Sequence, residues 1–142
     1  MSFEEKRNWV YLGVTAAVYL GYVAIILGRA EGTPLPEVAY AWPILGSIGL
    51  AIAATIVGSI LAAITAPKEV DKKDERDAGI HRYGEVIGYY VFSIGVLGAL
   101  VLAIAEVAHF WIGNAIYLSF VLAAQISTAV KLVAYRRGFP SW

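Results

Sequence analysis

Four long stretches of this chain contain no aspartate, glutamate, lysine or arginine, and they constrain its fold more than any other feature. They cover residues 9–28, 38–67, 86–105 and 107–130. A bilayer core of about 30 Å is crossed by about 20 helical residues, each rising ~1.5 Å, so every stretch is long enough. Because lipid offers no water to the backbone, a helix is the expected state. The sequence therefore predicts an all-α membrane protein, a bundle of four transmembrane helices.

The composition agrees with one membrane domain. Hydrophobic residues make up 59% of the 142 residues and charged residues only 15%, whereas about a quarter of a soluble domain is charged. Much of the charge lies between the second and third spans, in a segment that we call the hook (residues 67–83). We expect a single domain over residues 1–142, with spans at about 9–28, 43–66, 84–108 and 112–134.

The basic residues indicate how the helices are oriented, because lysine and arginine in short loops resist translocation across the membrane. Two precede the first span, five lie in the hook and three lie at the end of the fourth span, whereas Arg29 is the only one on the opposite side. We therefore expect both termini and the hook in the cytoplasm, and a multi-pass protein of the cytoplasmic (inner) membrane.

The hook also has the pattern of a helix start. Asp74 can act as an N-cap, and Glu75 and Asp77 would lie in the first turn, where negative charge suits the helix dipole. The third helix is therefore expected to begin near Glu75. One interpretation is a solvated helix start with basic residues reaching towards the interface; the other is a contact surface, whose mixed charge suits a protein partner better than anionic lipid. The candidate contact residues are Asp74, Glu75, Arg76, Asp77, Ile80 and Arg82.

The stretch DERDAGI, followed by HRYGEVIGYYVFSIGVL, resembles a group of uncharacterised small prokaryotic membrane proteins. Members of that group have four predicted spans and a D-E-R-x-x-x-I stretch just before the third. The resemblance implies that Asp74, Glu75, Arg76 and Ile80 are signature positions. It implies no activity.

Small residues recur on one helix face in each of the first three spans. Such spacing lets helix backbones approach closely in lipid, where the hydrophobic drive between helices is lost. We therefore expect a compact bundle, and the excess of small faces favours a homodimer. The faces are Gly13, Ala17 and Gly21; Ser47, Ala51, Thr55, Ser59 and Ala63 with Ala54, Gly58, Ala62 and Ala66; and Gly88, Gly95 and Ala99.

Five polar side chains fall inside or beside the expected spans, where polar groups normally face the bundle interior. They either bond neighbouring helices together, for about 0.6–2 kcal/mol each, or line a path for a substrate. We expect Glu106 to continue the face of the third span that carries Gly95, and to share it with His109. The five are Tyr19, Glu106, His109, Asn114 and Gln125.

No catalytic, cofactor-binding or metal-binding pattern accompanies these residues. The sequence has no cysteine, no phosphate-binding glycine loop and no dinucleotide-binding turn. The spacing of Glu106 and His109 occurs in di-iron bundles, but such sites need further glutamates on other helices, and the other spans contain none. A net charge of zero gives no reason to expect nucleic-acid binding. We therefore expect no enzyme activity, no cofactor and no metal.

These features predict a non-enzymatic integral membrane protein. We expect an accessory or regulatory subunit that lies in the bilayer and contacts a cytoplasmic or membrane protein partner through the hook. The alternative is a small channel or proton-coupled carrier, with a polar path between the helices lined by Tyr19, Glu106, Asn114 and Gln125.

Cysteine labelling tests the orientation. Single cysteines at Ser2, Lys73 and Ser141 are expected to resist an impermeant thiol reagent in intact cells, whereas a cysteine at Thr33 should react. The reason is that ten of the eleven basic residues lie on the side that is retained in the cytoplasm. Labelling at position 73 from outside would reverse the predicted topology.

Overall fold

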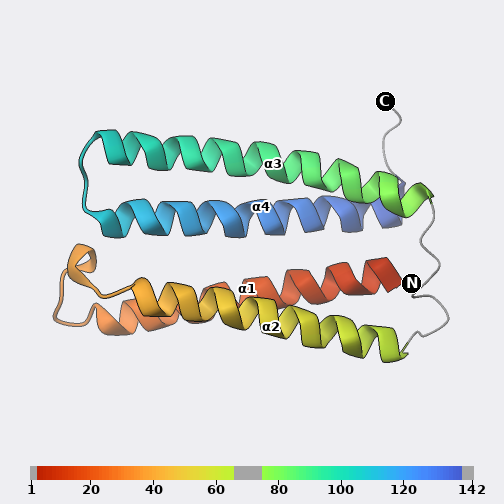
Figure 1. Ribbon diagram of the computed structural model, residues 1–142, viewed down its shortest axis with the longest axis horizontal. Helices are drawn as coiled ribbons and strands as arrows, with labels where there is room; N and C mark the ends of the chain where they lie inside the picture. The colour runs from red at the N-terminus through yellow and green to blue at the C-terminus, as the bar shows by residue number, and fades with distance from the viewer. Residues whose placement is uncertain (1–2, 66–74, 139–142) are drawn as a thin grey trace.

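Helices make up almost all of the described chain. The computed structural model describes residues 3–65 and 75–138. Its elements are α1 (Phe3–Arg29), the 3-10 helix η1 (Leu35–Glu37), α2 (Ala41–Thr65), α3 (Glu75–Ile104) and α4 (His109–Arg137), with no strand in the described ranges (Figure 1). All four α-helices are long and apolar enough to cross a membrane. The predicted all-α fold with four candidate membrane spans is therefore confirmed for these residues.

The helices form two antiparallel hairpins, α1 with α2 and α3 with α4 (Figure 1). The helices of the second hairpin pack most closely, and the two hairpins meet chiefly where α1 lies against α4. The four helices therefore share two ends. The loop end carries residues 30–40 and 105–108, and the charged end carries the starts of α1 and α3 and the end of α4.

Glycines bring α3 and α4 together. Gly88 and Gly95 of α3 lie against Ser127 and Ser119 of α4, and a Cβ atom at Gly95 would overlap the Ser119 side chain. Ala99, on the same face of α3, is also buried. The close approach gives dispersion contacts along the interface, which replace the hydrophobic effect as the attraction between helices in lipid.

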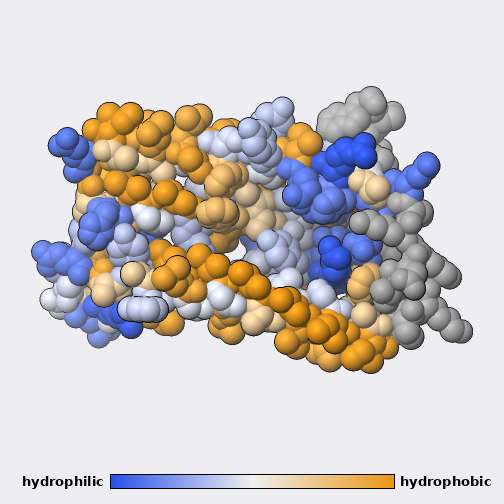
Figure 2. All heavy atoms as spheres, viewed as in Figure 1, coloured by the Kyte–Doolittle hydropathy of each residue, from blue (hydrophilic) through white to orange (hydrophobic). Residues whose placement is uncertain are grey.

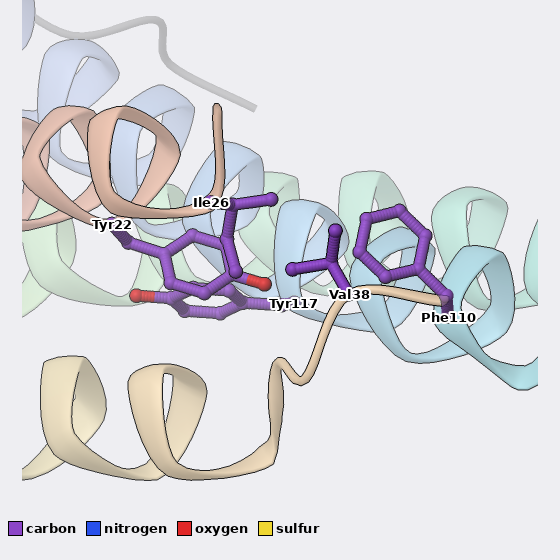
Figure 3. Close-up of a cluster of buried hydrophobic side chains, with 5 residues drawn as sticks. All are labelled: Tyr22, Ile26, Val38, Phe110 and Tyr117. Atoms are coloured by element: carbon purple, nitrogen blue, oxygen red, sulfur yellow. The ribbon is translucent and has the colours of Figure 1, made fainter. Parts of the chain in front are cut away.

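A cluster of buried apolar side chains holds the two hairpins together near the loop end (Figure 3). Tyr22 and Ile26 of α1 meet Phe110 and Tyr117 of α4, and Val38 joins the cluster from the loop between α1 and α2. The rings of Tyr22 and Tyr117 lie edge to face with their centroids 4.9 Å apart, which is a favourable aromatic geometry. We call these five residues the loop-end core.

The turn between α3 and α4 differs from the prediction. α3 ends at Ile104, and Glu106 has a left-handed backbone conformation with a φ of 57°. α4 then begins at His109. The expectation that Glu106 continues the third span and shares a helix face with His109 is therefore wrong. The sequence holds no sign of this stop, because the left-handed residue is a glutamate rather than the usual glycine.

The small-residue face of α1 lies apart from the contacts between the helices. Gly13, Ala17 and Gly21 are exposed. No other part of the described chain comes within 4 Å of a Cβ atom placed on Gly13 or Gly21. On α2, by contrast, Gly58 packs against Val10 of α1. Gly58 of α2 is therefore closely packed within the first hairpin, whereas Gly13 and Gly21 of α1 are not.

Alanine substitutions in α3 test the packing against α4. Gly95→Ala is expected to destabilise the protein by roughly 1–3 kcal/mol, because overpacking a filled interface carries that cost. Gly98→Ala is the control, since no described atom lies within 4 Å of its new methyl group, and it should carry no such cost. Thermal unfolding in detergent measures both. Equal stability of the two variants would contradict the close approach at Gly95.

Candidate functional site

Polar contacts join α3 to α4 at the charged end. Lys131 Nζ donates a hydrogen bond to Glu85 Oε1 at 2.6 Å. Tyr135 OH donates to Asp77 Oδ1, also at 2.6 Å. Arg76 Nη2 donates to the carbonyl oxygen of Tyr135 at 2.9 Å, and its guanidinium carbon lies 5.6 Å from the centre of the Tyr135 ring. Both charged and neutral groups of α4 are therefore bonded to the first three turns of α3.

The start of α1 is tied to the same end of α4. Arg136 Nε lies 3.5 Å from Glu5 Oε1, and the Arg136 guanidinium carbon lies 5.8 Å from the centre of the Trp9 ring. Three helices therefore meet in one set of polar contacts, which we call the charged-end network. Its members are Glu5, Arg76, Asp77, Glu85, Lys131, Tyr135 and Arg136.

Lys131 is a buried charge in this network. Its side chain is 8% exposed, whereas the Glu85 side chain with which it pairs is 58% exposed. The lysine stem crosses α3 at Gly84, where a Cβ atom would come within 2.5 Å of two of its carbon atoms. A buried ammonium group without a partner would be costly, so the glycine and the glutamate together allow Lys131 to lie between the helices.

The hook residues are divided between the interior and the surface. Ile80 is fully buried, and Asp77 is buried and bonded to Tyr135 of α4, so neither residue forms part of the surface. Glu75, Arg76 and Arg82 are exposed. The proposed helix cap Asp74 lies outside the described residues. The exposed part of the predicted contact site is therefore Glu75, Arg76 and Arg82.

A cavity of about 790 Å³ extends into the bundle from the charged end. Residues of all four helices line it, and α2 and α3 hardly touch one another. A second cavity of about 400 Å³ continues towards the middle of the bundle as far as Tyr117. Five residues line both cavities, which therefore form one crevice: Tyr11, Thr55, Ile56, Phe120 and Ala124. Figure 2 shows less hydrophobic residues between the hydrophobic surfaces of α3 and α2.

Two hydroxyl groups in the crevice have no hydrogen-bond partner among the described residues. They are Ser127 Oγ of α4 and Thr55 Oγ1 of α2, and both atoms are buried. Ser127 lines the larger cavity and Thr55 lines both. Buried polar atoms are nearly always hydrogen-bonded, so these two oxygen atoms, which are covered by the protein, are exceptions in the wall of the crevice.

Asn114 and Gln125, two of the predicted polar residues, bond α4 to α1. Asn114 Oδ1 accepts a hydrogen bond from Tyr22 OH at 2.5 Å. Gln125 Nε2 donates to Thr15 Oγ1 and to the carbonyl oxygen of Leu12. The two side chains therefore act as interhelical ties, the first of the two interpretations given by the sequence.

The other three predicted polar residues lie in separate surroundings. Tyr19 packs its ring against those of Tyr22 and Tyr117. His109 Nδ1 lies 3.0 Å from Tyr40 OH at the loop end. Glu106 is exposed in the turn between α3 and α4. The five residues do not gather into one site, and Glu106 is not inside the bundle.

The sequence pattern did not single out Lys131 or Tyr135 as site residues, although a signal for the Lys131–Glu85 pair exists. Glu85 is the last charge before the third uncharged stretch, and Lys131 is the first charge after the fourth. Antiparallel helices of similar length place two such residues at the same depth. Tyr135 follows one turn later and meets Asp77. The described residues include no group of three or more histidine, aspartate or glutamate side chains that could hold a metal ion.

The fold and this end of the bundle describe a helical protein with four candidate membrane-spanning helices and a crevice whose charged wall lies at one end. No family model, no curated protein and no solved structure matches the chain. The resemblance to small prokaryotic proteins with a D-E-R-x-x-x-I stretch therefore stays a prediction.

The two partners of the Lys131–Glu85 pair are expected to differ in importance. Glu85→Gln leaves the buried ammonium group without its counter-ion and should lower stability by roughly 1–3 kcal/mol. Lys131→Met keeps the apolar stem and leaves a carboxylate that is 58% exposed to solvent, so its cost should be smaller. Thermal unfolding of both variants in one detergent compares them. A larger loss for Lys131→Met would mean that the ammonium group is not desolvated.

Proposed function

We propose that the protein is a non-enzymatic accessory or regulatory subunit of a membrane assembly and that its charged end is the contact surface. The observation that carries this proposal is the charged-end network. It ties α1 and α3 to the end of α4 through ion pairs and hydrogen bonds of 2.6–3.5 Å. The exposed side chains of Glu75, Arg76 and Arg82 stand on this scaffold.

A fixed scaffold favours binding, because less conformational freedom is lost when a partner docks. The exposed face carries both signs of charge, which selects a partner surface with complementary charges and disfavours a uniformly charged one. The basic residues of the same end support a cytoplasmic location for the surface. The partner of this proposal is therefore a cytoplasmic protein, or the cytoplasmic part of a membrane protein, with a mixed charge pattern.

The accessory role fits the polar residues better than a carrier does. Asn114 and Gln125 are engaged in hydrogen bonds with α1, and Glu106 lies outside the bundle in an exposed turn. The crevice runs from the charged end to Tyr117, and the loop-end core fills the space between the hairpins beyond it. A substrate crossing the bundle would have to displace this core. We also propose a homodimer through the exposed small-residue face of α1.

Charge reversal on the exposed face tests the accessory role. Glu75→Lys and Arg82→Glu change exposed side chains that no contact of the charged-end network uses, so both variants should remain folded. If the surface binds a partner, each variant should lose the larger complex that chemical crosslinking captures in native membranes. The size of the crosslinked species is the measurement.

The matched control is Glu37→Lys, which reverses an exposed charge at the loop end and should leave the complex intact. A protein that forms no larger complex, or a complex that both reversals leave unchanged, would contradict the accessory role. The start of α3 would then be a solvated helix end without a partner.

A further inference from the structure

We propose that the crevice binds one zwitterionic phospholipid, with the headgroup at the charged end and one acyl chain directed towards Tyr117. This inference does not depend on the accessory role. It rests first on shape. The two cavities share part of their walls and have volumes of about 790 and about 400 Å³. Each volume lies within the range of about 300–1,000 Å³ that is usual for sites of small organic ligands.

The polarity of the crevice changes along its length. Of the described residues that line the cavity nearer Tyr117, none is charged, and most are aliphatic or aromatic. The cavity at the charged end has both charged and polar walls. A ligand that fills both must have a polar end and an apolar end, as an amphiphile has. The titratable residues of the polar cavity are Glu4, Arg7, Tyr11, His81, Glu85, Tyr89, Lys131 and Tyr135.

The charges at the polar end favour a headgroup that carries both signs. Two acids, Glu4 and Glu85, are matched by two bases, Arg7 and Lys131. An arginine binds a phosphate oxygen strongly, and the Arg7 side chain remains 47% exposed although it lies 3.8 Å from Glu4. A carboxylate attracts an ammonium group, and Glu85 remains 58% exposed although it pairs with Lys131. A purely anionic headgroup would meet repulsion from the two acids.

Two residues of intermediate polarity lie at the middle of the crevice. Ser127 lines the polar cavity, and Thr55 lies where the two cavities join. The ester groups of a phospholipid, which lie between its headgroup and its chains, would come to the same depth.

The contacts between the helices leave a route from the bilayer. α2 packs mainly on α1, α3 packs mainly on α4, and α2 and α3 make few contacts with one another. A lipid of the adjoining leaflet can enter between α2 and α3 without leaving the membrane. One of its chains then lies in the crevice while the other stays among the lipids.

Photolabelling tests the site. The protein is reconstituted into vesicles of phosphatidylethanolamine and phosphatidylglycerol that contain a trace of phosphatidylethanolamine with a diazirine group midway along one chain. After illumination, mass spectrometry locates the labelled residues. The expected labels fall on the less exposed walls of the apolar cavity, on Thr55, Val121 and Ala124. A phosphatidylglycerol probe with the same chain should label these residues less.

Two pairs of variants give the controls. Ala124→Phe fills the junction of the cavities and should lower crevice labelling roughly tenfold, a loss of about 1.4 kcal/mol of binding energy, whereas Ala129→Phe, on the exposed side of α4, should not. If Ala124→Phe does not yield folded protein, Ala51→Phe on the wall of α2 replaces it, with exposed Ala53→Phe as its control.

A third pair tests the headgroup. Arg7→Gln should reduce labelling of the crevice, and Lys6→Gln, whose side chain lines a different surface, should not. Labels spread evenly over the exposed faces of the helices, or crevice labels that Ala124→Phe leaves unchanged, would overturn the proposal. Equal labelling by the two probes would overturn the zwitterionic assignment. Absence of crevice labels would indicate that a second copy or another protein covers the crevice, and would also overturn it.

Discussion

Where Gly84, Gly88 and Gly95 face α4, the backbones of α3 and α4 come close enough for a lysine stem to lie across one helix and for serines to fill the remaining space. Larger residues at these positions would push the helices apart. Lys131 would then no longer be buried against Gly84, and its hydrogen bond to Glu85 in the charged-end network would be broken. The charged end and the wall of the crevice both depend on this approach, because the same helix face forms both.

The number and the apolar character of the helices could be predicted from the sequence, because length and the absence of charge over 20 or more residues are local properties. The position of a helix end within an apolar region could not. At Glu106 the chain turns through a left-handed residue with no glycine or proline to mark it. Because of this turn, Glu106 is exposed and does not face the interior of the bundle as expected.

The rotation of each helix about its own axis decides which polar groups meet, and sequence spacing leaves that rotation open. Asn114 and Gln125 were recognised as intramembrane polar residues, but their partners Tyr22 and Thr15 follow from how α1 lies against α4. Asp77 was expected at the surface and instead accepts a bond from Tyr135. The crevice lies away from the path that the alternative interpretation placed at Tyr19, Glu106, Asn114 and Gln125, because it results from the weak contact between α2 and α3.

The interface between α1 and α4, which joins the two hairpins, can form only after α4 has been synthesised. Each hairpin consists of helices that are adjacent in the chain, so either hairpin can form with local contacts as it is synthesised. The interface between the hairpins joins the first of the four helices to the last. Until α4 has been synthesised, the polar face of α1, with Thr15 and Tyr22, has no partner on the second hairpin. Early in biosynthesis, the first hairpin therefore carries on its surface the hydroxyl groups that later join the two halves.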